Sequence, residues 1–229
     1  MLMVRFPKQH PLIEALVEVF TDHADPEKAA AMTAYMKNHF PFVGLQKPVR
    51  AELQKEFLAA AKNESITTVH KIVKELWSLP EREYQYVAME LLVATKRKWN
   101  EDSLLVFETL ALQRSWWDTV DLIASKLFGG YCRIEHERYK KLFLDYAAND
   151  NIWLNRVAII HQLTYKAATD MVLFEEIFLR CGHKKEFFIQ KAIGWALRQY
   201  SSVDPNAVIR FAEKHPLSAL ARREALRKL

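Results

Sequence analysis

The feature that most constrains the fold is a recurring pattern, in which a helix led by aromatic residues begins about every 35 residues. These helices are predicted to open at the segments that start with Pro80, Ser115, Asn151 and Lys185. Successive starts are 35, 36 and 34 residues apart. Because one pair of helices occupies a period of this length, the sequence predicts an α-solenoid, in which each repeat packs on its neighbours.

The composition agrees with a helical fold. Only 5 Gly and 8 Pro occur in 229 residues, of which 50% are hydrophobic. So few helix breakers favour long helices with short connections over an all-β fold. Identity between the repeats is low, as in HEAT-like repeats. We therefore predict an all-α, curved α-solenoid of HEAT-like helical repeats, a single domain over residues 1–229 with one concave groove.

Charge and cysteine usage restrict the protein class. A net charge of +5 is compatible with nucleic-acid binding but does not establish it. Cys132 and Cys181 stand alone in the sequence, which predicts buried thiols in a reducing compartment. Lys8 and Pro11 interrupt the segment Met1–Leu16, so we expect neither a signal peptide nor a membrane span there. These features predict a soluble, intracellular protein.

The sequence lacks the motifs of several common chemistries. It contains no phosphate-cradling glycine loop, no Gly-x-Ser-x-Gly elbow and no His-Glu-x-x-His helix. Nor does any cluster of His and Cys have the spacing of metal ligands. We therefore predict no metal and no cofactor.

Two adjacent tryptophans and a nearby acid mark the first candidate site. Trp117 and Asp121 are one helical turn apart, so they share a helix face. An indole beside a carboxylate is suited to a flat, positively charged group, although Asp121 could instead cap a neighbouring helix. Trp116 is expected in the core, and Asp118 is expected to stabilise the start of the helix.

A second candidate surface lies on the helix predicted over Lys185–Tyr200. Lys191 precedes Trp195 by one turn and Arg198 follows it by one turn, all on the face opposite the apolar stripe. An indole between two cations is a mixture that nucleic-acid surfaces use. The alternative is a half-buried Trp195 that packs on the next repeat, with both charges solvated.

Two further residues are ambiguous. Arg156 follows Trp153 by three residues and precedes the apolar run 157–160, so it either pairs with an acid or reaches an anion in the groove. Tyr35, on a helix predicted over residues 29–39, could be ordinary core.

Several segments, spread in one order over residues 10 to 225, together resemble the bacterial AlkD-type DNA alkylation repair enzymes, which are HEAT-like DNA glycosylases. The segments are Tyr35-Met36-Lys37-Asn38-His39-Phe40, Glu75-Leu76-Trp77, Leu79-Pro80-Glu81-Arg82-Glu83, Ser115-Trp116-Trp117-Asp118, Val120-Asp121, Asp150-Asn151-Ile152-Trp153-Leu154, and Lys185-Glu186-Phe187-Phe188-Ile189-Gln190-Lys191-Ala192-Ile193-Gly194-Trp195. Such a set is far more specific than any one of its members.

The resemblance implies a role for each candidate. Asp121 would be the catalytic carboxylate, with Trp117 and Trp195 holding the deoxyribose and backbone of the lesion. The residues implied in DNA binding are Tyr35, Gln46, Lys47, Arg156, Lys191 and Arg198. The chain departs from the family pattern at Lys47, where a threonine or serine would be expected, so a cation replaces a hydroxyl contact to DNA.

The implied function is excision of N3- and N7-alkylpurines, such as 3-methyladenine and 7-methylguanine, from double-stranded DNA in base excision repair. The expected protein is a monomer in the bacterial cytoplasm that acts at the nucleoid. Because such a purine already carries positive charge, no general acid is required, and one carboxylate can stabilise the sugar cation and position water. Two alternatives remain, a non-enzymatic protein that binds damaged or branched DNA and a protein–protein scaffold.

Overall fold

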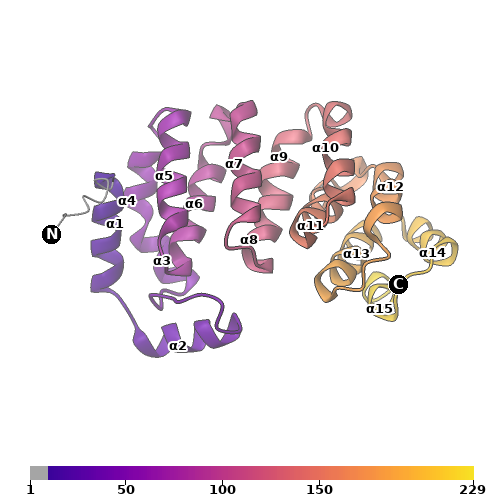
Figure 1. Ribbon diagram of the computed structural model, residues 1–229, viewed down its shortest axis with the longest axis horizontal. Helices are drawn as coiled ribbons and strands as arrows, with labels where there is room; N and C mark the ends of the chain where they lie inside the picture. The colour runs from indigo at the N-terminus through magenta and orange to yellow at the C-terminus, as the bar shows by residue number, and fades with distance from the viewer. Residues whose placement is uncertain (1–9) are drawn as a thin grey trace. The chain divides into compact units, whose positions relative to one another are not determined.

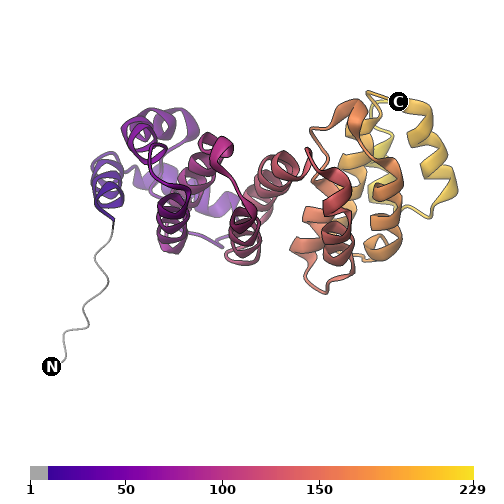
Figure 2. The same ribbon diagram turned by 90° about the horizontal axis from the view of Figure 1, so that it is seen from above.

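The computed structural model describes residues 10–229, and the first part of the N-terminal segment considered above, residues 1–9, lies outside the described residues. Helices joined by loops make up this described part, and no strand occurs in it (Figures 1 and 2). The all-α prediction is therefore confirmed. None of the helices within residues 10–229 has the length and apolar character needed to cross a membrane.

The first compact unit ends at Ser103. Its helices are α1 (Pro11–Asp22), α2 (Pro26–Tyr35), α3 (Lys47–Leu53), α4 (Lys55–Ala61), α5 (Ile66–Ser78), α6 (Arg82–Ala94) and the short 3-10 helix η1 (Lys96–Lys98). Within it α1 packs on α4, and α5 lies beside α6 (Figure 1). Apolar residues of α1, α5 and α6 form its core.

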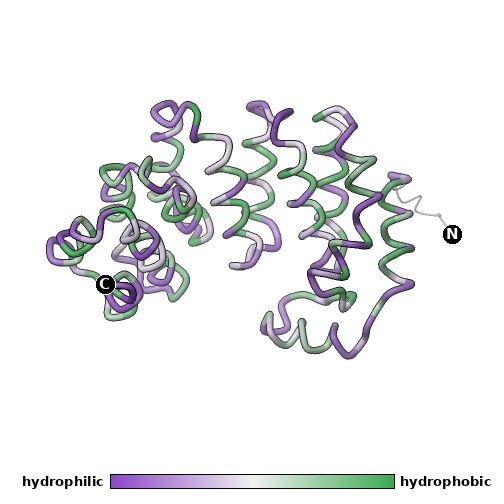
Figure 3. The backbone as a smooth tube through the Cα atoms, turned by 180° about the vertical axis from the view of Figure 1, so that it is seen from behind, coloured by the Kyte–Doolittle hydropathy of each residue, from purple (hydrophilic) through white to green (hydrophobic). Residues whose placement is uncertain are grey.

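The second compact unit begins at Leu104, inside α7 (Glu101–Leu112). Its further elements are α8 (Trp117–Leu122), the π-helix η2 (Ile123–Phe128), α9 (Gly129–Cys132), α10 (His136–Ala148), α11 (Ile152–Ile160), η3 (Lys166–Ala168), α12 (Met171–Cys181), α13 (Phe187–Tyr200), α14 (Pro205–Lys214) and α15 (Ala219–Ala225). Packing runs from α10 to α11, from α11 to α13 and from α13 to α15. Hydrophobic residues recur along these helices (Figure 3), which gives each one an apolar face for its neighbour.

The predicted helix starts are confirmed to within two residues. The aromatic-led helices α6, α8, α11 and α13 begin at Arg82, Trp117, Ile152 and Phe187, so each starts 35 residues after the one before. The predicted curvature, the concave groove and the single domain over residues 1–229 stay predictions.

Three of these helices each carry a buried amide side chain that forms hydrogen bonds with the preceding segment of the chain. Gln85, Asn155 and Gln190 each occupy the fourth position of their helix, and each donates to carbonyls at the end of the preceding helix or just beyond it. Gln85 donates to the carbonyl oxygen of Leu79 at 2.8 Å, and Asn155 donates to that of Asn149 at 2.8 Å. Gln190 donates to the carbonyl oxygen of Lys184 at 2.5 Å. Since terminal helix carbonyls lack intrahelical partners, these amides satisfy groups that would otherwise be costly to bury.

The helix that carries Tyr35 ends earlier than expected. It was predicted over residues 29–39, but α2 ends at Tyr35. Lys37 and Asn38 then adopt φ angles of 57° and 61°. A left-handed conformation cannot continue an α-helix, so these two residues turn the chain away.

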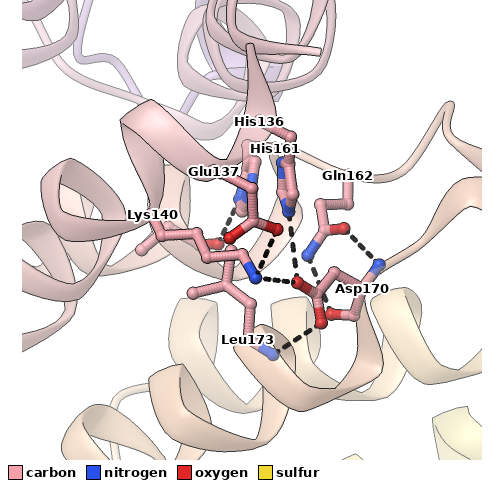
Figure 4. A network of polar contacts seen from close by, with 8 residues as sticks. His136, Glu137, Lys140, His161, Gln162, Asp170 and Leu173 are labelled. Carbon is pink, nitrogen blue, oxygen red and sulfur yellow. Dashed lines mark hydrogen bonds and ion pairs between the residues drawn. The ribbon is translucent and has the colours of Figure 1, made fainter. Parts of the chain in front are cut away.

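A network of polar contacts centred on Asp170 fixes the start of α12 (Figure 4). The Asp170 carboxylate accepts from the Leu173 amide at 2.9 Å, and its Oδ2 lies 2.9 Å from Lys140 Nζ and 3.4 Å from His136 Nε2. Gln162, just after α11, accepts a hydrogen bond from the Asp170 amide at 2.7 Å. The network therefore joins α10, α12 and the end of α11.

Candidate functional site

The first candidate pair lies at the start of α8. Trp117 is the first residue of this helix, and Asp121 is its fifth, so one turn separates them as predicted. Both side chains are half-buried. Asp118 lies in the first turn of the helix, where a carboxylate favours the positive end of the helix dipole, as expected.

Arg156 pairs with Asp121. Its Nε donates to Oδ1 of Asp121 at 2.6 Å, and its Nη2 donates to Oδ2 at 2.8 Å. The remaining Nη1 donates to the carbonyl oxygen of Phe188 at 2.5 Å. Of the two alternatives for Arg156, the structure selects the ion pair with an acid, and the direct contact with the DNA backbone stays a prediction.

The pair comes from matching positions of neighbouring helices. Asp121 is the fifth residue of α8 and Arg156 is the fifth residue of α11, and these two helices pack together. Phe188, the second residue of α13, presents its carbonyl to the same guanidinium. Three successive repeats of the second unit therefore contribute to one small site.

Burial and pairing act in opposite directions on the carboxylate. Burial raises the pKa of Asp121 above its ordinary value, and the hydrogen bonds from Arg156 lower it in part. Both carboxylate oxygens accept from one guanidinium, a geometry that fits the ionised acid. An ionised, half-buried carboxylate can stabilise a positive charge that develops beside it.

Three aromatic side chains pack together close to the ion pair. The ring centroids of Trp116 and Trp153 are 5.8 Å apart, and Phe188 lies 5.0 Å from Trp116 and 5.1 Å from Trp153. The Arg156 guanidinium carbon lies 5.9 Å from the centroid of the Phe188 ring. Trp116 was expected in the core, and the structure places it in this half-buried cluster.

The helix that carries Asp121 changes type directly after it. An ordinary helix was expected to continue through residues 124–128, but α8 ends at Leu122 and the π-helix η2 follows. The Ser125 hydroxyl donates to the carbonyl oxygen of Asp121 at 2.7 Å. A π-helical turn widens the helix and changes the direction of its side chains, and such turns are frequent at functional sites.

The second candidate surface lies on α13. Trp195 is half-buried, with Lys191 one turn before it and Arg198 one turn after it. Both cations pair with Glu224 of α15, at 2.9 Å from Lys191 Nζ to Oε1 and through a short contact from Arg198 Nη1 to Oε2. The face opposite the apolar stripe is thus partly covered by α15, which buries Gly194.

The remaining predicted residues belong to the first unit. Tyr35 ends α2 with 69% of its surface exposed. Gln46 is the N-cap of α3 and Lys47 is its first residue, and both are exposed. Their predicted contacts with DNA, and those of Trp117, Trp195, Lys191 and Arg198, stay predictions.

A buried acid shapes the loop that leads to Gln46 and Lys47. Glu83 accepts hydrogen bonds from the amides of Val43, Gly44 and Leu45 at 3.0, 2.9 and 3.0 Å. Gly44 has a φ of 100°, and a Cβ there would lie 2.1 Å from the carbonyl oxygen of Asp25. Only glycine fits this turn, because both the dihedral angle and the space exclude a side chain.

The two cysteines are buried, as predicted, and neither forms a disulfide. Burial raises the pKa of both Cys132 and Cys181 to about 12, so each stays a neutral thiol. Among residues 10–229, no group of three or more His, Cys, Asp or Glu side chains is arranged to hold a metal ion.

Sequence reasoning missed three residues of these sites. Glu224 was not singled out, and Phe188 and Trp153 were noted only as members of aromatic helix starts. A usable signal did exist for the aromatic pair, since Trp153 and Phe188 are 35 residues apart and each is the second residue of its helix. No comparable signal marks Glu224.

The family model and the solved structure that match this chain both describe DNA alkylation repair enzymes. A family model described as DNA alkylation repair enzyme matches residues 16–229. A solved structure described as a predicted DNA alkylation repair enzyme from Enterococcus faecalis is 34% identical in sequence, with a TM-score of 0.84. That similarity covers 90% of this chain and 96% of the other. No curated protein matches the chain.

Proposed function

Because the chain belongs to the family of DNA alkylation repair enzymes, we propose that it is a DNA glycosylase of base excision repair that acts on positively charged alkylpurines. Its substrates would be 3-methyladenine and 7-methylguanine in duplex DNA. The observation that carries this proposal is Asp121, a half-buried carboxylate held by Arg156 one turn from Trp117. This arrangement suits a reaction in which positive charge moves onto the sugar.

The chemistry needs few groups. The bond between C1′ of the deoxyribose and the purine nitrogen breaks, and its electron pair neutralises the cationic base. Water then adds to C1′ and loses a proton, which leaves the free base and an abasic sugar. Ionised Asp121 would stabilise the sugar cation and orient the water, while the faces of Trp117 and Trp195 would attract the developing charge.

The pairing of Asp121 also predicts which lesions are released. A carboxylate that accepts two hydrogen bonds from Arg156 is poorly suited to donate a proton to a neutral leaving base. We therefore expect single-turnover release of 7-methylguanine from a defined duplex but no release of hypoxanthine, a neutral purine lesion. Release of hypoxanthine at a similar rate would contradict this role of Asp121.

DNA binding, measured on the same duplexes, separates the remaining possibilities. Affinity that falls steeply as salt rises, without release of any base, would identify a non-enzymatic DNA-binding protein. A lack of salt-dependent DNA binding would favour a protein–protein scaffold instead.

Replacing Arg156 by methionine should shift the acidic limb of the pH–rate profile. Arg156 lowers the pKa of Asp121, so its loss raises that pKa further above the ordinary value. Since the reaction needs the ionised carboxylate, activity is lost as the pH falls through this pKa. We expect the acidic limb of the rate profile to shift to higher pH in the Arg156→Met variant.

The pH dependence of single-turnover release, measured on both proteins, tests this shift. Arg180→Met serves as the matched control, because Arg180 is an exposed cation on α12. Its acidic limb should coincide with that of the parent. An unchanged limb in Arg156→Met would show that a group other than Asp121 titrates.

A further inference from the structure

A single carboxylate binds two cations on one face of α13. Glu224 of α15 accepts from Lys191 at 2.9 Å through Oε1 and from Arg198 through Oε2. Lys191 and Arg198 are seven residues apart on α13, which is about 10.5 Å along a helix axis. Their side chains nevertheless converge on one group, and Trp195 lies between them in the sequence on the same helix face.

The convergence depends on a close approach of two helices. Gly194, on α13, has no side chain, and a Cβ there would lie 2.5 Å from Cβ of Glu224 and 2.8 Å from the carbonyl oxygen of Ala221. The absence of a side chain lets α15 lie directly on α13. The same contact carries Glu224 to a point from which both cations can reach it.

Glu224 offsets the mutual repulsion of the two cations. Two like charges that share one partner repel each other, and without the acid both long side chains would separate to gain solvation and rotamer freedom. The hydrogen bonds from Lys191, and then those from Arg198, lower the pKa of Glu224, so the acid stays charged near neutral pH.

The Glu224 side chain is more buried than either cation. The Glu224 side chain is 9% exposed, whereas Arg198 is 21% exposed and Lys191 is 38% exposed. An ammonium and a guanidinium have more donors than the one contact that each makes to Glu224. An anion could therefore bind on the solvent side of both groups while Glu224 stays in place.

We propose that Glu224 is a positioning residue, which holds Lys191 and Arg198 together as a two-cation site for one phosphate of the DNA backbone beside Trp195. This inference rests on the DNA binding included in the proposed function. Glu224 is negatively charged, as the DNA backbone is, but it would increase DNA affinity by holding the two cations in place. Preorganised cations bind more tightly because less side-chain entropy is lost on binding.

The sign of a substitution distinguishes this role from simple electrostatics. Glu224→Gln raises the net charge of the protein by one, so general attraction alone would tighten DNA binding. Loss of the positioning role should instead weaken binding, and we expect an affinity about fivefold lower, within the range that a preorganised contact contributes. Glu213→Gln, an equal change at an exposed acid of α14, is the matched control and should not weaken binding.

The experiment measures dissociation constants of an undamaged duplex of defined sequence at one fixed salt concentration. The proteins are the parent, Glu224→Gln, Glu213→Gln, the double variant Lys191→Met/Arg198→Met and the triple variant that adds Glu224→Gln. The inference predicts that adding Glu224→Gln to the parent weakens DNA binding, whereas adding it to the double variant does not weaken DNA binding further. Unchanged or tighter binding by Glu224→Gln would overturn it.

Two further measurements distinguish loss of the positioning role from loss of the fold. Thermal unfolding reports whether Glu224→Gln keeps its fold, and Glu224→Asp provides a variant that keeps the charge but is one methylene shorter. We expect Glu224→Asp to weaken binding as well, because the shorter acid cannot hold both cations; parent-like affinity in a folded Glu224→Asp would contradict the inference. Base release by the parent is measured separately, on the methylated duplex. A parent that binds DNA but releases no base would reject the glycosylase and leave this result interpretable, whereas a parent that binds no DNA would reject both.

Discussion

Asp121→Asn is expected to slow the single-turnover release of 7-methylguanine by about 100-fold, the loss typical of removing one preorganised electrostatic group. Asparagine has nearly the shape of aspartate and keeps one oxygen that can accept from Arg156. It removes the negative charge that would stabilise the sugar cation. Binding of the methylated duplex should change far less than the rate, because the charge acts mainly on the transition state.

Asp118→Asn is the matched control for this variant. Asp118 lies three residues earlier in the same helix, and the same substitution there removes the same charge. We expect its rate to stay within about threefold of the parent, since the interaction of Asp118 with the helix dipole and its coulombic effect on Asp121 are both modest. Equal rates for Asp121→Asn and the parent would remove Asp121 from the mechanism.

Gly129→Ala is expected to destabilise the second unit by about 3 kcal/mol, at the upper end of the usual cost of overpacking. A Cβ at Gly129 would lie 2.2 Å from the carbonyl oxygen of His161, which follows α11 directly. Backbone cannot move aside as a flexible side chain can. The methyl group must therefore push α9 away from the end of α11, the helix that carries Arg156.

Urea unfolding followed by tryptophan fluorescence measures this effect, because the second unit contains Trp116, Trp117, Trp153 and Trp195. Gly130→Ala is the matched control, and its expected effect on stability has the opposite sign. Gly130 is exposed in the same short helix, so alanine there should stabilise the protein by up to about 1 kcal/mol. A Gly129→Ala variant as stable as the parent would show that the close approach to His161 is not rigid.

The local part of the candidate site could be predicted from the sequence. The spacing of Trp117 and Asp121 was enough to place both on one turn, because helical geometry fixes the relation of residues four apart. The same reasoning placed Lys191 and Arg198 on either side of Trp195. The partners of these groups could not be predicted in this way, since Glu224 lies 26 residues beyond Arg198 on another helix.

The change of helix type after Asp121 also escaped the sequence reasoning. Apolar periodicity continues through residues 123–128, so nothing in the pattern distinguishes a π-helix from an α-helix there. The two types differ by one residue per hydrogen-bonded turn, and packing against α11 can favour either.

Local chain geometry determined what the sequence could reveal by itself, namely an all-α fold, helix starts near every 35th residue and the order of aromatic and charged groups along each helix. Tertiary structure alone decided which acid each cation meets. Arg156 pairs with Asp121, and Lys191 and Arg198 pair with Glu224. The reason is that the offset between packed helices depends on close approaches, such as those at Gly129 and Gly194, which spacing along one helix does not encode.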